Sequence, residues 1–297
     1  MGKTAFVFAG QGSQYTGMGQ DLYNFSDGVK KIYDMDVEIK DLCFTGPKEQ
    51  LDITSYTQPA IFLTDLACAK VLNENGIKAE GVAGFSLGEI PAACYCGLMT
   101  LRQAYDFVKY RSKVMHECSL INRGSMIAVL KLTAEKVEKI CNSFDKVYPA
   151  NYNCPGQTVV AYADNVADDL QRTVINNGGK VIKLPVSGAF HSSFMDDAMI
   201  KITTYLLNEI LSVMQIPLYS NVTASLYLNP KEQLAKQVNH PVLWHKTIEN
   251  MISDGFDVFI EIGPGKVLSG LIKKIDPDVH VHNVSDYPSL EKTLKEL

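Results

Sequence analysis

Short apolar runs alternate with longer amphipathic stretches along the first third of the chain. Residues 4–8 form an apolar run of strand type that ends in a glycine-punctuated loop at 10–14. Apolar side chains then recur at helical spacing over residues 58–73, and residues 81–85 have the character of a buried strand. The alanine-rich residues that follow favour a helix. This alternation of strands and helices is typical of an α/β protein.

The middle of the chain has a different order of elements. The predicted elements are a strand at 124–130, a helix at 134–141, strands at 147–153 and 157–163, a helix at 168–177 and a strand at 181–186. Cys154-Pro155-Gly156 marks the hairpin between the second and third of these strands. The resulting β-α-β-β-α-β order is the ferredoxin-like signature. It predicts a small ferredoxin-like subdomain at 124–187, inserted into a larger domain.

The larger domain is predicted to comprise residues 1–123 and 188–297. Its later part contains helical patterns at 195–213 and 243–253, strand-type runs at 217–220 and 258–262, a helix after Gly263-Pro264-Gly265 and a short strand holding His280 and His282. We expect an α/β-hydrolase-like domain with a mostly parallel sheet.

The composition excludes several classes of protein. No stretch of the 297 residues stays apolar long enough to span a bilayer, and the N-terminal segment lacks the features of a secretory signal. We therefore expect a cytoplasmic protein. The net charge of -5, with no basic stripe interleaved with aromatic residues, argues against nucleic-acid binding. Seven scattered cysteines favour reduced thiols over a disulfide framework or a zinc site, and a monomer is the simplest expectation.

Ser86 is the candidate nucleophile. It lies at the centre of Gly84-Phe85-Ser86-Leu87-Gly88, which matches the G-x-S-x-G elbow of a strand-to-helix turn. Such a turn exposes the hydroxyl at the end of the strand, and the helix N-terminus with the Leu87 N–H is ready to stabilise an oxyanion. A glycine-rich structural turn with an ordinary serine is the alternative explanation of the motif.

A serine hydroxyl needs a base within hydrogen-bond reach, and histidine is the usual one. The candidates are His116, His191, His240, His245, His280 and His282. His191 follows residues 186–190, where the insert should return to the larger domain, and a junction loop is a good position for a cleft residue. Spacing alone leaves its role open. A Ser-His-Asp triad would need an acidic residue between Ser86 and His191, and none stands out there. Such a triad is possible, but the sequence gives it little support.

Arg111 is the candidate clamp for an anionic substrate group. Its helix begins with a capping box of Thr100 and Gln103, and the neighbours of Arg111 at helical spacing are apolar. A buried guanidinium that faced the serine would bind a carboxylate in a bidentate manner and select dicarboxylic acyl groups such as malonyl. A surface arginine is the alternative.

Eight features, in order, resemble one enzyme family nearly end to end. They are FAGQGSQ at 8–14, TQPA at 57–60, GFSLGE at 84–89, Arg111, NYNCPGQ at 151–157, GAFHS at 188–192, SNVT at 220–223 and EIGPGKVL at 261–268. The family is that of the malonyl-CoA:acyl-carrier-protein transacylases, the acyltransferases of fatty acid and polyketide synthesis. The resemblance implies transfer of a malonyl group from malonyl-CoA to the phosphopantetheine thiol of an acyl carrier protein, without a cofactor or metal.

The resemblance also implies roles for individual residues. Ser86 is the acyl-bearing nucleophile, His191 the base, Arg111 the carboxylate clamp, Gln11 and Leu87 the oxyanion hole, Gln237 the residue whose backbone carbonyl orients the histidine, and Phe190, Gln58 and Met115 further substrate-binding residues. Phe190 in this position indicates malonyl over methylmalonyl. One departure concerns Phe85, because many family members have histidine immediately before the nucleophile.

Two other functions are considered beside the transferase. An acyl-thioester hydrolase would share the elbow and the histidine, but it has no need of Arg111. A non-catalytic carrier-docking protein would keep the fold, but it has no need of the set Ser86, His191, Arg111 and Gln11. Because a carrier protein is usually acidic, docking should use basic residues near the cleft. Candidates for docking are Lys183, Lys266, Lys273 and Lys274.

Overall fold

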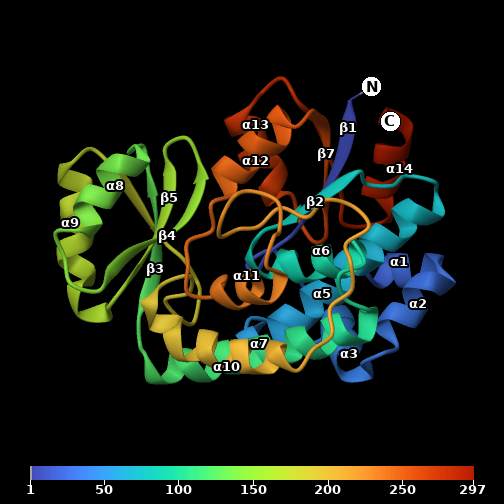
Figure 1. Cartoon of the computed structure of the whole chain (residues 1–297), viewed down its shortest axis with the longest axis horizontal. Helices are drawn as coiled ribbons and strands as arrows, with labels where there is room; N and C mark the ends of the chain where they lie inside the picture. Colours follow the sequence, from blue (N-terminus) through green and yellow to red (C-terminus); the bar gives the residue numbers. More distant parts are fainter. Residues whose placement is uncertain (1) are drawn as a thin grey trace.

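A four-stranded parallel sheet forms the centre of the larger part of the molecule (Figure 1). The computed structural model describes residues 2–297. The strand order is β2 (Gly81–Gly84), β1 (Lys3–Phe8), β7 (Phe256–Ile262) and β8 (His280–Val284), and all neighbouring pairs are parallel. β2 and the second half of β1 are buried throughout, as expected for a parallel sheet covered on both faces.

Helices surround this sheet and bury its apolar side chains. The long helices are α5 (Thr54–Glu74) and α7 (Leu101–Ile121), which pack against each other, and α10 (Asp196–Leu207), which lies beside α7 (Figure 1). The shorter ones are α1 (Gln20–Phe25), α2 (Asp27–Tyr33), α3 (Val37–Thr45), α4 (Lys48–Leu51), α6 (Glu89–Tyr95), α11 (Pro230–Lys236), α12 (Trp244–Ser253), α13 (Val267–Ile275) and α14 (Tyr287–Glu296). The capping box of Thr100 and Gln103 at the start of α7 is confirmed.

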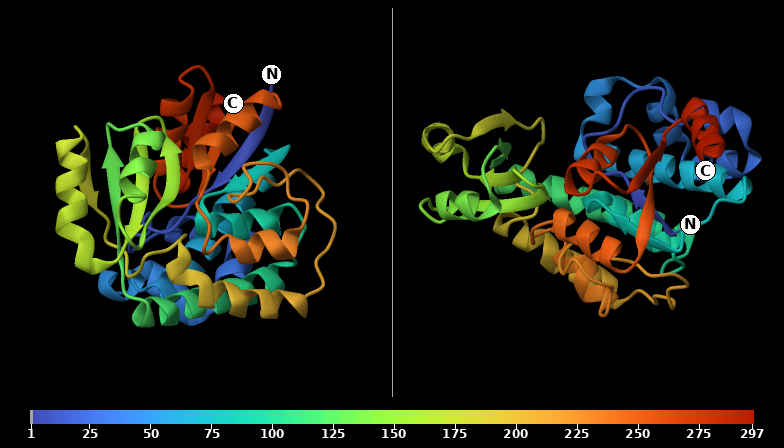
Figure 2. Two further views of the ribbon diagram at one scale, coloured as in Figure 1. Left: turned by 60° about the vertical axis from the view of Figure 1, so that its left-hand side comes forward. Right: turned by 90° about the horizontal axis from the view of Figure 1, so that it is seen from above.

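A second, antiparallel sheet projects from one side of the larger part (Figure 2). Its strands are β3 (Ser125–Leu130), β4 (Val147–Cys154), β5 (Gln157–Tyr162) and β6 (Lys180–Lys183), in the order β4-β5-β3-β6. Helices α8 (Ala134–Cys141) and α9 (Ala167–Asn176) pack on it, and its β4 contacts α12 and α13. The β-α-β-β-α-β order is confirmed, while domain boundaries at 124 and 187 stay a prediction.

Two predicted elements after the insert are wrong in part. The helix expected at 195–213 ends at Leu207, because the following segment has no continuous face to bury: Ile210 and Val213 are 85% and 89% exposed. The strand expected at 217–220 is reduced to isolated bridges between Leu218 and Val82 and between Tyr219 and Leu226. It stops there because the Ser220 N–H bonds the Ser225 carbonyl in a local turn.

Three further observations concern membrane spans, cysteines and metal ligands. Between residues 2 and 297, no helix has both the length and the apolar character needed to cross a bilayer. All seven cysteines are free thiols, and six of them are buried. In this same part of the chain, no three histidine, cysteine or acidic side chains come together as a metal-ion site.

Candidate active site

Ser86 occupies a tight turn between β2 and a short 3-10 helix, Ser86–Gly88. Its φ of 53° lies in the left-handed region. Both flanking glycines are required by close backbone approaches: a Cβ on Gly84 would lie 2.0 Å from the Gly88 carbonyl carbon, and one on Gly88 would lie 2.2 Å from the Phe8 oxygen. The Ser86 N–H donates to Asn221 Oδ1 at 2.8 Å. The strand-turn-helix context predicted for the serine is therefore present.

His191 lies directly beside this serine. Its Nε2 is 2.7 Å from Ser86 Oγ, and its Nδ1 is 2.8 Å from the main-chain oxygen of Gln237. Because a carbonyl can only accept, Nδ1 carries the proton and Nε2 offers its lone pair to the hydroxyl. Burial, and then the charge of Arg111, lower the pKa of His191 to about 4. The imidazole is thus neutral at neutral pH, as a base must be, and a carbonyl occupies the place of a triad acid.

Arg111 projects from α7 to the same point. Its side chain is fully buried; one Nη atom donates to Gln58 Oε1 and the other to Gln237 Oε1, both at 2.6 Å, and the second lies 3.5 Å from Ser86 Oγ. Burial lowers the pKa of Arg111 to about 10, so the guanidinium remains charged at neutral pH. Among the residues described, no carboxylate forms an ion pair with it, and its Nε has no partner. A buried, unpaired cation beside a nucleophile favours an anionic substrate group.

Three predicted substrate-binding residues surround this cation and the histidine. Gln58 Nε2 donates to Met115 Sδ at 3.6 Å, which turns the amide oxygen of Gln58 toward Arg111. Met115 is buried on α7 beside it. Phe190 precedes His191 directly and is 6% exposed. The structure therefore brings Gln58 and Met115 to Arg111, whereas Phe190 is placed by its position next to His191 and its burial. The contacts of all three with a substrate stay predictions.

The loop after β1 lies against the nucleophile turn. A Cβ on Gly10 would lie 2.5 Å from the Phe85 carbonyl oxygen, so Gln11 follows a backbone in close contact with the turn. Leu87 is the second residue of the 3-10 helix, and the first N–H groups of a helix have no partner within it. This placement is compatible with an oxyanion hole formed by the Gln11 and Leu87 N–H groups, which stays a prediction.

Phe85, the residue that departs from the family pattern, has a packing role. Its ring contacts Trp244 edge-on, with ring centroids 5.5 Å apart and an interplanar angle of 71°. It also closes over Gly10, whose Cβ position is 3.0 Å from the Phe85 ring. Phe85 therefore supports the elbow from the side of α12.

The sequence reasoning missed several contacts beneath the site. Glu89 is fully buried and accepts hydrogen bonds from the Asn221 N–H and from Gln237 Nε2. The Gln237 side chain also contacts Arg111, whereas only its backbone carbonyl was predicted to matter. Glu89 ends the GFSLGE segment and Asn221 lies in the SNVT segment, both of which carry the family resemblance. That location was the only signal in the sequence, and it does not indicate what either residue does.

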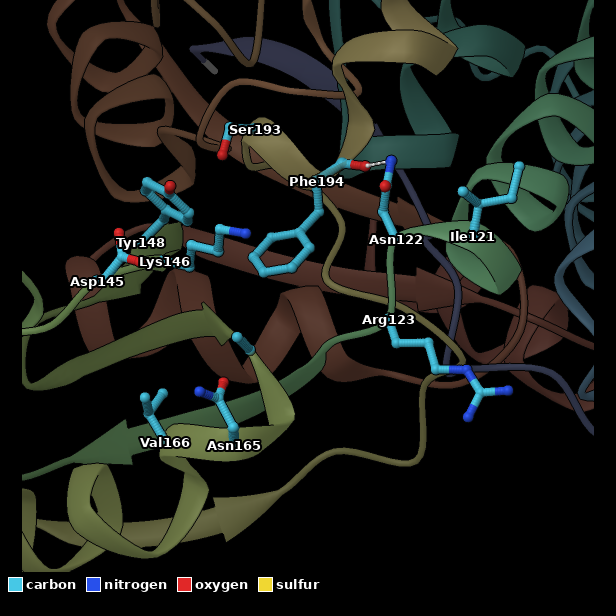
Figure 3. Close-up of a pocket in the computed structure, with 11 residues that line it drawn as sticks. Ile121, Asn122, Arg123, Asp145, Lys146, Tyr148, Asn165, Val166, Ser193 and Phe194 are labelled. Atoms are coloured by element: carbon cyan, nitrogen blue, oxygen red, sulfur yellow. Dashed lines mark hydrogen bonds between the residues drawn. The ribbon is translucent and has the colours of Figure 1, made fainter.

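A separate cavity of about 450 Å³ lies at the end of α7, where the chain enters the antiparallel sheet (Figure 3). The Phe194 ring points into it, and Asn122 donates to the Phe194 carbonyl at 3.2 Å. Arg123 and Lys146 supply positive charge on opposite walls. The lining does not include Ser86, His191 or Arg111.

The four predicted docking lysines are all exposed. They are Lys183, Lys266, Lys273 and Lys274. The ammonium group of Lys273 is bound to the carbonyls of Pro277 and Val279, at 3.0 and 2.6 Å. Lys273 is thus less free than the others to contact a partner.

Comparison with known proteins agrees with this geometry. The family model described as "Acyl transferase domain" matches residues 5–290. A malonyl CoA-acyl carrier protein transacylase of Bacillus subtilis (strain 168) is 36% identical over 312 residues, which cover 100% of this chain and 98% of the relative. One from Staphylococcus aureus (strain MRSA252) is 37% identical over 297 residues, covering 96% of each chain.

Solved structures are similar over the same length. The crystal structure of a malonyl CoA-acyl carrier protein transacylase from Clostridium perfringens ATCC 13124 has a TM-score of 0.95 and 39% identity, covering 99% of this chain and 96% of that one. A malonyl-transacylase in complex with its type II PKS acyl-carrier protein has a TM-score of 0.95 and 31% identity, covering 99% of this chain and 100% of that one. The likeness therefore extends over both sheets.

Proposed function

The chain belongs to the acyl transferase family, among the malonyl CoA-acyl carrier protein transacylases, and on this basis we propose that Ser86 carries the malonyl group as an ester. The reaction moves malonyl from malonyl-CoA to the thiol of an acyl carrier protein. The observation that carries the assignment is one constellation: a neutral histidine nitrogen at 2.7 Å and a guanidinium at 3.5 Å from the same hydroxyl.

The first half-reaction loads the serine. His191 Nε2 takes the proton from Ser86 Oγ as the oxygen attacks the thioester carbon, and the N–H groups of Gln11 and Leu87 stabilise the oxyanion. The bond from Oγ to carbon forms, the bond from carbon to sulfur breaks, and His191 returns the proton to the leaving CoA sulfur. The Gln237 carbonyl holds Nδ1–H throughout and stabilises the imidazolium.

The second half-reaction reverses these steps with another thiol. His191 takes the proton of the carrier's phosphopantetheine thiol, whose sulfur attacks the ester carbon. The bond from sulfur to carbon forms, the bond from carbon to Oγ breaks, and the proton returns to Ser86. The exchange of a thioester for an ester and back involves no redox change and needs no redox cofactor. We infer that His191 and the oxyanion-hole N–H groups supply the catalysis without a metal ion.

Arg111 and Phe190 supply the selectivity. We propose that the free carboxylate of the malonyl group binds the guanidinium, which no protein carboxylate neutralises directly. A carboxylate in a dry site beside a fixed cation is held in one orientation, with the thioester carbon toward Ser86. Phe190, buried beside His191, limits the space for an α-methyl branch.

We propose that the parallel sheet with its nucleophile turn forms an α/β-hydrolase-like domain, and that residues 124–187 form a ferredoxin-like subdomain. We further propose that Lys183, Lys266 and Lys274 dock the acidic carrier. The cytoplasmic location and the monomeric state stay predictions.

A transfer assay tests the function against the hydrolase. Purified protein is mixed with labelled malonyl-CoA and a holo acyl carrier protein, and malonyl-carrier and free malonate are measured together, with Ser86→Ala as the control. The transferase predicts that label accumulates on the carrier and that Ser86→Ala abolishes it. Free malonate as the main product would establish the hydrolase, and no turnover with either acceptor would favour the non-catalytic protein.

A further inference from the structure

Glu89 is a fully buried carboxyl that the proposed chemistry does not use. It is the first residue of α6, three positions after the nucleophile. One oxygen accepts the Asn221 N–H at 2.8 Å, and the other accepts Gln237 Nε2 at 2.5 Å. Because a buried carboxylate is unfavourable unless it is well bonded, such a residue beneath an active site needs an explanation.

The contact with Gln237 determines which end of that amide faces Arg111. An amide has one accepting and one donating end, and Nε2 of Gln237 donates to Glu89 and to the Ser86 carbonyl. Oε1 is therefore left to accept from the Arg111 guanidinium, at 2.6 Å. If the amide were reversed, its NH₂ group would face a cation. Glu89 thus fixes Arg111 through a neutral bridge and leaves the guanidinium free of a direct ion pair.

The contact with Asn221 supports the nucleophile turn. Asn221 donates through Nδ2 to the Gly84 carbonyl at 2.6 Å and accepts the Ser86 N–H at 2.8 Å, so its side chain spans the turn. Glu89 holds the backbone of this same residue. Asn221 therefore stabilises the left-handed conformation of Ser86, and the Glu89 carboxylate in turn holds Asn221 in place.

We propose that Glu89 is a positioning residue that couples the nucleophile turn to the carboxylate clamp, and thereby helps to determine selectivity for malonyl over uncharged acyl groups. The inference rests on the proposed function. Its two arms have different consequences: the Asn221 arm acts equally on every acyl substrate, whereas the Gln237–Arg111 arm has an additional effect on substrates with a free carboxylate.

The ionisation of Glu89 gives the proposal a distinctive signature. Burial raises the pKa of Glu89 to about 7, while hydrogen bonds from the Asn221 N–H and Gln237 Nε2, the nearby Tyr227 hydroxyl and the charge of Arg111 oppose the shift. Two charged or titratable groups of the described chain face Glu89. They are Arg111, on α7, and Tyr227, which directly follows the isolated bridge between Tyr219 and Leu226. The ionised carboxylate is a strong acceptor at both oxygens, whereas protonation makes one oxygen an O–H donor and a weaker acceptor. The arms therefore weaken as the pH falls through about 7.

The test compares two buried glutamates. Glu89→Gln removes one accepting oxygen at the site, while Glu261→Gln makes the same change on β7, where the carboxylate accepts from the backbone N–H groups of Leu268 and Ser269 and from the Ser269 hydroxyl. The measurement is the ratio of kcat/KM for acylation by malonyl-CoA to that by acetyl-CoA, from pH 6 to pH 8. Thermal melting of each variant monitors folding.

The expected results separate positioning from simple structural support. Glu89→Gln should lower the malonyl-to-acetyl ratio about tenfold and remove its pH dependence, since one charged hydrogen bond is lost. Glu261→Gln should leave both unchanged even if it lowers the melting temperature. Equal losses for both substrates in Glu89→Gln would overturn the proposal.

The wild-type protein provides a readout that needs no variant. Its malonyl-to-acetyl ratio should be lower at pH 6 than at pH 8, because Glu89 takes up a proton in this range. Failure of the proposed function looks different, because the wild-type protein would then either not be acylated by malonyl-CoA at any pH or pass the malonyl group to water and not to the carrier.

Discussion

The two sheets differ in what they bury. The end of the parallel sheet buries charged and polar side chains, among them Arg111, Glu89 and His191, and holds Ser86 and His191 at positive φ. The core of the antiparallel sheet is apolar; it consists of Ile127, Val129, Leu132, Val137, Ile140, Cys141, Val147, Val160, Tyr162, Leu170 and Val174. One region gathers buried charged groups around the Ser86 hydroxyl, whereas the other buries a mainly apolar core, with only neutral polar side chains such as Asn151, Asn153 and Thr158.

The two regions should therefore respond differently to substitution, one in catalytic rate and the other in stability. Buried polar groups and strained residues persist where the surrounding structure fixes them, commonly at functional sites. Apolar cores respond to substitution mainly through stability. Changes at the end of the parallel sheet should therefore alter chemistry first, and changes in the antiparallel sheet should alter stability first.

His191→Ala should have the largest effect. Removal of the base is expected to slow acylation by 10²- to 10⁴-fold, measured by rapid quench with malonyl-CoA. His245→Ala, on α12 with Nε2 3.2 Å from Glu249 Oε1, is the matched control and should stay within about threefold of the wild type. A loss below tenfold for His191→Ala would remove it from the mechanism.

Leu170→Ala tests the other side of the comparison. Leu170 is fully buried under the antiparallel sheet, so the variant should lower the free energy of unfolding by about 3 kcal/mol. Its acylation rate at 25 °C should match the wild type as long as the protein is folded. Urea titration gives the stability and rapid quench gives the acylation rate. A large loss of rate in the folded variant would show that packing in the antiparallel sheet also controls the chemistry at Ser86.

Arg111→Ala should separate substrates rather than abolish catalysis. We expect kcat/KM for malonyl-CoA to fall about 100-fold, because charged hydrogen bonds to the carboxylate are lost, and acetyl-CoA to be affected much less. Arg102→Ala, at the exposed start of the same helix, is the control. Parallel losses for both thioesters would show that Arg111 supports the fold and does not bind the carboxylate.

Acid should inactivate the site through His191. Acylation is expected to fall about tenfold per pH unit below about pH 4, where the imidazole is protonated and cannot accept the serine proton. Acid should also lower the free energy of unfolding. A histidine whose pKa is lowered by folding contributes stability above its unfolded pKa of about 6.5, and this contribution is lost as the pH falls through about 4. Rates and circular dichroism measured together check both, and a rate independent of pH down to 3.5 would contradict the assignment.

Charge reversal of the docking lysines should have the smallest effect. Lys183→Glu, Lys266→Glu and Lys274→Glu should each raise KM for the carrier about threefold, because single exposed charges contribute little. Acylation by malonyl-CoA should not change. An unchanged KM at physiological and low salt would remove that lysine from the docking surface.

The comparison also explains what could be predicted from the sequence. Strand and helix periodicity located both sheets, and the glycines around Ser86 predicted its turn because close backbone approach requires them. The order of elements placed His191 at the return from the insert, close to where it meets Ser86. These features depend on local pattern.

The missed features depend on contacts between residues far apart in the chain. Glu89 meets Asn221 and Gln237, 132 and 148 residues later, and no period or spacing indicates which way an amide side chain faces. The short helices between residues 20 and 51 were not predicted either, because each is stabilised by packing under α5 and by local caps such as Ser26 and Asp36. The early end of α10 reflects exposure that periodicity alone does not show.

The role of Ser86 is tested most directly by the intact mass of the protein after mixing with malonyl-CoA and acid quenching. The wild-type protein should gain one malonyl group, which holo carrier protein should remove, and Ser86→Ala should gain none. A malonyl adduct on Ser86→Ala equal to that on the wild type would show that Ser86 does not carry the acyl group.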